Sequence, residues 1–95
     1  MALNQKEIGQ RVAKLRLEKG LTQEQFANVL NISVSLIGKI ETGNRGLSID
    51  LAAEFSEFFN VSTDYILFGK PNERNEFKKY LNTIIEQISI IEKNL

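Results

Sequence analysis

The amino-acid sequence predicts an all-α fold of five short helices, a linker and a longer C-terminal helix. Apolar residues recur at steps of three and four along the chain, and no stretch alternates between apolar and polar residues as a half-buried strand does. Glycine and asparagine residues, at which helices commonly end, separate the segments. With 95 residues, of which 42% are hydrophobic, the chain is long enough to bury one core.

The amino-acid composition excludes several classes of function. The sequence contains no cysteine and no histidine, so disulfides, zinc sites, thiol nucleophiles and the usual general base are absent. We therefore expect a protein that is not an enzyme and that binds no metal or cofactor. The start, "MALNQKEIGQ", lacks the pattern of a signal peptide, and no apolar run is long enough to span a membrane. We expect a soluble cytoplasmic protein without a membrane partner.

The first two helices are predicted by their end signals. A helix over about Gln5–Lys19 ends at Gly20, which can adopt the left-handed conformation that follows many helices. Thr22 is followed three residues later by Gln25, the spacing of a capping box. This motif predicts a second helix over about Gln23–Leu30.

A third helix follows after a very short turn. Asn31 stands where a left-handed residue is expected, and Ser33 is a good N-cap for a helix that stops at Gly43. The turn is too short for these two helices to run side by side. Ile32, Ile37 and Ile40 are expected to be buried and to anchor the third helix from beneath. The positions left on its outer face are Val34, Ser35, Gly38 and Lys39.

The remaining helices show the same end signals. Ser48 caps the fourth helix and Asn60 ends it, while Ser62 or Thr63 opens the fifth, which Gly69 ends. The expected bounds are 49–59 for the fourth helix, 63–68 for the fifth, 70–75 for a linker and 76–95 for the last helix.

The last helix carries a wide apolar stripe. Because an uncovered stripe of this kind is unstable in water, it must be covered. It can fold back over the fourth and fifth helices of its own chain, or it can form a homodimer interface with a second copy, which is the reading we favour. The stripe consists of Phe77, Tyr80, Leu81, Ile84, Ile85, Ile88, Ile91 and Leu95, with Ile90 on the opposite side.

Charge is unevenly distributed along the chain. The formal net charge is zero, but residues 1–46 hold seven basic and four acidic residues, and residues 47–95 hold five basic and eight acidic. A molecule of this kind can turn a basic face toward phosphates. A chance imbalance of this size is equally compatible with the sequence.

The stretch "LRLEKGLTQEQFANVLNISVSLIGKIETGNR" resembles the helix-turn-helix of the Cro/repressor family of transcriptional regulators, also called the xenobiotic-response-element type. The resemblance runs from about Ile8 to Gly69, because "SIDLAAEFSEFFNVSTDYILFG" is similar to the family's fourth and fifth helices. In this sequence Asn31 and Asn60 replace the usual glycines, and Leu36 occupies a position that is often polar or aromatic.

The resemblance implies a compact five-helix DNA-binding domain over residues 1–69 and a sequence-specific transcriptional regulator, in the usual case a repressor. It implies binding to a palindromic operator in double-stranded DNA as a dimer, with helix 33–42 in the major groove. It also implies a buried pair between Arg16 and Glu41. The expected DNA-binding residues are Gln23, Ser33, Val34, Ser35, Gly38, Lys39, Asn44 and Arg45.

Several individual roles stay open at this point. Lys39 can donate to guanine or pair with a phosphate, and Val34 can contact a thymine methyl group or complete local packing. Ser33 is a helix cap first and a phosphate donor second. Arg11 and Lys14 are expected to be solvated.

An alternative function belongs to another class. The zero net charge and the apolar C-terminal stripe are also compatible with a protein-interaction module, such as an antitoxin-like protein whose last helix inserts into a groove of a toxin. The sequence does not indicate which small-molecule effector, if any, acts on the protein.

Overall fold

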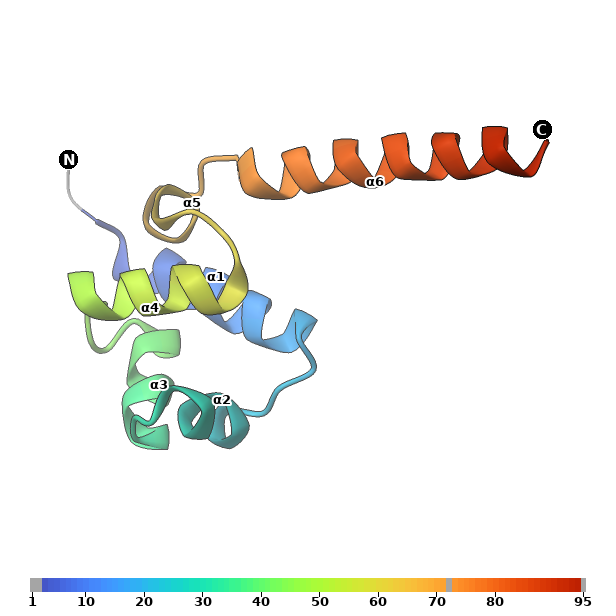
Figure 1. Cartoon of the computed structure of the whole chain (residues 1–95). Helices are drawn as coiled ribbons and strands as arrows, with labels where there is room; N and C mark the ends of the chain where they lie inside the picture. The colour runs from blue at the N-terminus through green and yellow to red at the C-terminus, as the bar shows by residue number, and fades with distance from the viewer. Residues whose placement is uncertain (1–2, 72, 95) are drawn as a thin grey trace.

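The computed structural model describes residues 3–71 and 73–94 in backbone and, apart from residues 73–77, in side chain. All secondary structure in this part of the chain is helical, which confirms the predicted all-α fold. Figure 1 shows five short helices gathered into one body and a sixth helix that projects from it. The helices are α1 (Gln5–Glu18), α2 (Gln23–Leu30), α3 (Val34–Thr42), α4 (Ile49–Phe59), α5 (Thr63–Phe68) and α6 (Glu73–Lys93).

The ends of the short helices are set by local signals. Asn31 and Asn60 both have φ of 55° and close α2 and α4, while Gly43 and Gly69 close α3 and α5 with positive φ values. Asparagine tolerates this left-handed conformation better than other residues with a side chain. The predicted ends of these four helices are confirmed.

The N-caps are equally local. In the predicted capping box, the backbone N–H of Gln25 donates to Thr22 Oγ1 at 3.1 Å, and the backbone N–H of Thr22 donates to Gln25 Oε1 at 2.9 Å. Ser33, Ser48 and Ser62 cap α3, α4 and α5 in the same way as Thr22, each accepting a bond from the backbone three residues ahead. These caps explain why the four short helices α2–α5 begin where they do.

The core joins α1–α5 around a group of aromatic rings. Phe26 of α2 is fully buried, and its ring centroid lies 5.1 Å from those of both Phe55 and Phe59 in α4. Such tilted aromatic pairs add to the stabilisation from burial alone. The remaining buried apolar residues of this core are Ile8, Val12 and Leu15 from α1, Ala27 from α2, Ile37 and Ile40 from α3, Val61 before α5, and Ile66 from α5.

The sixth helix begins earlier than the sequence indicated. It starts at Glu73, two residues after Pro71, rather than at residue 76. Proline is disfavoured within a helix but leaves the residues after it free to form one, and an acidic residue suits a helix N-terminus. The connection between α5 and α6 is therefore shorter than the expected linker at 70–75.

The sixth helix also gives the molecule its extended shape. The radius of gyration is 16.7 Å, compared with about 12 Å for a compact domain of this length. All residues from 78 to 94 are exposed, and Figure 1 shows α6 leading away from the other helices. Among the described residues, no helix is long and apolar enough to cross a membrane.

Candidate nucleic-acid interface

The second and third helices are joined by a tight turn. The backbone N–H of Ile32 donates to the carbonyl of Ala27 at 3.0 Å, and Asn31 takes the left-handed conformation between them. Ala27 is 2% exposed, and its small side chain allows the crossed helices to approach closely. The turn therefore fixes the direction in which α3 leaves α2.

The inner side of α3 is anchored against α1. Ile37 and Ile40 have exposed fractions of 0% and 1%, whereas Ile32, also expected to be buried, is only partly buried against the core. Gly9 of α1 lies directly against the end of α3, where a methyl group on Gly9 would stand 2.3 Å from the carbonyl oxygen of Ile40 and 2.6 Å from that of Glu41. The two helix backbones thus meet with no room for a side chain. Sequence reasoning missed this contact, because a glycine in a helix carries no signal of what lies opposite it.

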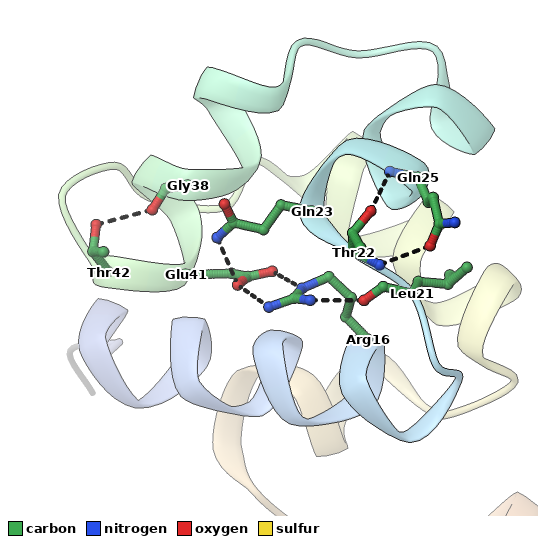
Figure 2. A network of polar contacts seen from close by, with 8 residues as sticks. All are labelled: Arg16, Leu21, Thr22, Gln23, Gln25, Gly38, Glu41 and Thr42. Atoms are coloured by element: carbon green, nitrogen blue, oxygen red, sulfur yellow. Dashed lines mark hydrogen bonds and ion pairs between the residues drawn. The ribbon is translucent and has the colours of Figure 1, made fainter.

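An ion pair ties the same two helices together. Arg16 Nε donates to Glu41 Oε2 at 2.8 Å, and Arg16 Nη2 donates to Glu41 Oε1 at 3.0 Å (Figure 2). The two side chains are 11% and 6% exposed. Arg16 Nη1 also donates to the carbonyl of Leu21 at 2.7 Å. The structure therefore places together the two residues that the family resemblance pairs, and the guanidinium additionally holds the turn before α2.

Gln23 belongs to this network as well. Its Nε2 donates to Glu41 Oε1 at 3.1 Å, so that Gln23 links the start of α2 to the end of α3 (Figure 2). The sequence analysis placed Gln23 among the expected DNA-binding residues, where a phosphate is the contact that suits the start of α2, and did not foresee this bond. An amide nitrogen has two N–H groups, so a second N–H is left for a phosphate, and the expected contact stays a prediction.

The outer side of α3 is open. Val34, Ser35 and Lys39 are exposed, with 46% of Val34 accessible to solvent. Around Gly38 the nearest atom that a methyl group would meet is Gln23 Oε1, at 4.0 Å. Ser33 Oγ accepts from the backbone N–H of Leu36 at 3.1 Å, which is its role as a cap. The outer side therefore offers a short polar and apolar surface with one long basic side chain.

The loop after α3 is held at its base while two of its side chains are free. The backbone N–H of Arg45 donates to the carbonyl of Lys39 at 3.1 Å, and both Asn44 and Arg45 are exposed. Gln5 of α1 accepts a bond from the backbone N–H of Leu47 through its Oε1, at 3.4 Å. The loop thus places an amide and a guanidinium beside the open end of α3.

Arg11 is not solvated, so that expectation was wrong. Its Nε donates to the carbonyl of Ile66 at 2.8 Å and its Nη2 to that of Leu67 at 3.0 Å. These are carbonyls at the end of α5, where a helix lacks partners for its last acceptors. Arg11 therefore ties α1 to α5, whereas Lys14 is exposed as expected.

The apolar stripe of α6 is uncovered wherever its side chains are described. Tyr80, Leu81, Ile84, Ile85, Ile88 and Ile91 are between 43% and 72% exposed. The side chain of Phe77 and the whole of Leu95, which we also assigned to this stripe, lie outside the described part of the chain. No group of histidine, cysteine, aspartate or glutamate suited to a metal occurs among the described residues.

The arrangement of α2 and α3 is that of a helix-turn-helix DNA-binding protein. It consists of a capped helix, a turn of three residues and a second helix whose inner side is buried and whose outer side is exposed. Comparison with known families agrees: residues 12–66 match the model of the helix-turn-helix family. The chain belongs to this family, in its Cro/repressor or xenobiotic-response-element type, and the predicted resemblance is confirmed.

Two relatives of the chain are transcriptional regulators by name. The chain is 45% identical over 56 residues to the uncharacterized HTH-type transcriptional regulator YazB of Bacillus subtilis, covering 59% of this chain and 81% of that protein. It is 32% identical over 85 residues to the HTH-type transcriptional regulator ImmR of the same species, covering 85% and 67%. A similar solved structure is the restriction-modification controller protein C.AhdI from Aeromonas hydrophila, with a TM-score of 0.60, 27% identity and coverage of 65% and 94%.

Proposed function

We propose that this protein is a repressor that binds a palindromic operator in double-stranded DNA as a homodimer, with α3 in the major groove. The observation that carries the proposal is the contrast between the two sides of α3. Ile37 and Ile40 hold the inner side in the core, while Val34, Ser35 and Lys39 remain exposed on the other. The major groove admits one α-helix and displays a distinct pattern of donors and acceptors for each base pair.

The side chains around α3 suit different parts of the DNA. Lys39 is long enough to reach a base edge or a phosphate, and Val34 can contact a thymine methyl group. Ser33 and Ser35 add hydroxyl groups, and Gly38 lets the backbone come close. Asn44, Arg45 and Gln23 flank the helix and suit the DNA backbone, whose contacts position the protein without reading sequence.

The dimer in this proposal is formed by α6, with residues 1–69 as the DNA-binding domain. The exposure of every residue from 78 to 94 supports a cover supplied by a second copy rather than by the body of the same chain. A continuous apolar stripe left in water is a liability for a monomer. Two copies joined in this way can place two recognition helices on half-sites one DNA turn, or about 34 Å, apart.

DNA selection tests the recognition part of the proposal. We would select bound duplexes from a random pool and measure the affinity for the selected operator and for a shuffled duplex of the same length at one salt concentration. The operator should bind on the order of a thousandfold more tightly, and both affinities should fall steeply with salt. Equal affinities for all duplexes would overturn the proposal.

Substitutions on α6 test the dimer. A charged residue in the stripe should prevent association, so Ile84→Glu and Ile88→Glu should sediment as monomers that keep the helical circular dichroism of the body. Ile90→Glu is the matched control, because Ile90 lies on the opposite side of the same helix and should leave the dimer intact. Dimerisation unchanged by Ile84→Glu and Ile88→Glu would show that α6 is not the interface.

The direction of regulation needs a separate measurement. We would place the selected operator over a promoter and follow transcription in vitro as protein is added. A repressor should lower the yield of transcript in proportion to operator occupancy. An increase in transcript at the same occupancy would identify an activator instead.

The exposed stripe also suits the protein-interaction alternative, in which an amphipathic helix lies in the groove of a different protein. Sedimentation of the unaltered chain separates the two readings. A monomer at micromolar concentration would favour that alternative, whereas a stable dimer supports the dimeric regulator.

A further inference from the structure

The edge of the α6 stripe carries an ordered set of charges. In the heptad notation of coiled coils, Leu81 and Ile88 occupy a positions and Ile84 and Ile91 occupy d positions. The neighbouring e positions are Lys78, Ile85 and Glu92, all of them exposed and aligned along one edge of the stripe. Read in chain order, this edge is positive, apolar and negative.

This order of charges is complementary to the same order read in the opposite direction, because the positive end then faces the negative end. When two identical helices pair in opposite directions, each e position faces an e position of the other copy, and the core layers form between a and d positions. Lys78 then faces Glu92 of the second copy, Ile85 faces its own counterpart near the two-fold axis, and Glu92 faces Lys78. Leu81 packs against Ile91 of the second copy, and Ile84 against Ile88.

The other edge of the stripe permits the same arrangement. Its g positions are Tyr80, Gln87 and Asn94, all exposed and uncharged. In the reversed pair Tyr80 faces Asn94 and Gln87 faces its own counterpart, so no like charges meet on this edge. In a parallel pair e faces g, which sets Lys78 against Glu73, Ile85 against Tyr80 and Glu92 against Gln87. Lys78 then keeps a partner of opposite charge, but Glu92 has none. Only in the reversed pair do both charges of the e edge face an opposite charge.

We infer that α6 pairs with α6 of a second copy in the antiparallel direction, centred near residue 86, with Lys78 of each copy opposite Glu92 of the other, so that both charges of the e edge are paired. The inference rests on the proposed α6 dimer and specifies its geometry. In a pair centred near residue 86, each α6 begins 13 residues from the centre, at Glu73. The two points at which the DNA-binding domains are attached are then about 39 Å apart along the helices, a distance comparable to one DNA turn.

Engineered cysteines distinguish the two orientations, because the natural sequence has none. In the antiparallel pair, residue 81 of one copy meets residue 91 of the other, while two copies of residue 81 stand about 15 Å apart along the helices. A mixture of Leu81→Cys and Ile91→Cys chains, carrying different tags, should give a mixed cross-link on oxidation or with a short bismaleimide. Each variant alone should give little cross-linked product.

The opposite pattern would overturn the inference. Strong self-cross-linking of Leu81→Cys alone, together with little mixed product, would identify a parallel pair and leave the proposed dimer standing. A dimer in which neither position cross-links would place the interface outside α6. A chain that sediments as a monomer would instead contradict the proposed dimer itself, so the two failures are distinguishable.

A charge exchange gives an independent test by sedimentation equilibrium. Lys78→Glu and Glu92→Lys should each weaken dimerisation roughly three- to tenfold by placing like charges opposite each other twice in the dimer. The double variant should recover the original affinity to within about twofold, because both ion pairs are restored with reversed sign.

The double variant is needed because Lys78→Glu alone would weaken a parallel dimer as well as an antiparallel one. In the parallel dimer Lys78 faces the position of Glu73 in the second copy, so Lys78→Glu would weaken it, but adding Glu92→Lys would not restore it. Lys79→Glu and Glu86→Lys are matched controls, with the same charge changes at exposed positions on the opposite side of α6. Failure of the double variant to recover affinity would overturn the antiparallel assignment.

Discussion

Gly9 in α1 and Gly38 in α3 both lie within helices, yet their surroundings are opposite. A methyl group on Gly9 would stand 2.3 Å from the carbonyl oxygen of Ile40, whereas one on Gly38 would meet only Gln23 Oε1, at 4.0 Å. Gly9 is required by the contact between α1 and α3. No contact among the described residues requires Gly38.

The difference shows that α3 serves two sets of constraints. Its inner side is fixed by packing, by the backbone contact with Gly9 and by the ion pair of Glu41 with Arg16. Its outer side carries few internal contacts, so its residues are free to be chosen for what they bind. Substitutions on the inner side should therefore change stability, and those on the outer side should change DNA binding.

The largest effect is expected from Glu41→Ala. This change leaves the guanidinium of Arg16, in a side chain 11% exposed, without its carboxylate, and it removes the acceptor of Gln23 Nε2. Removing one partner of a buried ion pair costs about 3–5 kcal/mol, and urea denaturation should show a loss of that size. Glu54→Ala, at an exposed position of α4, is the control and should change the free energy of unfolding only slightly. Equal stability of the two variants would show that the ion pair contributes nothing.

Gly9→Ala should be the next most disruptive change. The added methyl group collides with backbone carbonyls, which cannot move aside without separating α1 from α3. Overpacking of this kind costs about 1–3 kcal/mol, sometimes more, which exceeds the gain of up to about 1 kcal/mol from replacing a helical glycine. Thermal or urea unfolding should therefore show a net loss of stability. A stabilised Gly9→Ala variant would mean that the two helices are not in contact at this point.

Lys39→Ala tests the outer side. We expect little change in unfolding free energy and weaker binding to the selected operator, by about ten- to a hundredfold for each half-site if Lys39 donates to guanine. A phosphate contact would instead lower the affinity for all duplexes alike and reduce the salt slope by about one for each copy of the chain, or about two for the dimer. Lys79→Ala on α6 is the matched control. Binding unchanged by Lys39→Ala would argue against α3 as the recognition helix.

Features governed by neighbouring residues could be predicted from the sequence. The left-handed conformations of Asn31 and Asn60, and the capping box of Thr22 and Gln25, depend on residues within one helical turn. Such local preferences act through the same hydrogen bonds in most proteins. The family resemblance added the pairing of Arg16 with Glu41, which lie 25 residues apart.

Features governed by distant residues could not be predicted. The bonds of Arg11 to the end of α5 join residues 55 and 56 positions apart, and the bond of Gln23 to Glu41 joins residues 18 apart. Arg11 and Gln23 are polar residues on amphipathic helices, where the sequence pattern predicts only a solvated face. Their partners depend on how the helices pack, which the pattern does not specify.

Gly38→Ala should have the smallest effect on stability and the most informative effect on binding. Because the nearest atom that the methyl group would meet beyond its chain neighbours and the backbone of α3 is Gln23 Oε1, at 4.0 Å, the variant should gain about 0.5–1 kcal/mol from better helix propensity and a less flexible unfolded chain. If the glycine lets the backbone of α3 approach the bases, the same methyl group should weaken operator binding. Measuring both quantities on one variant separates the two readings. A more stable protein with weaker binding supports close approach, whereas a more stable protein with unchanged or tighter binding would mean that this position contacts nothing and merely tolerates a glycine.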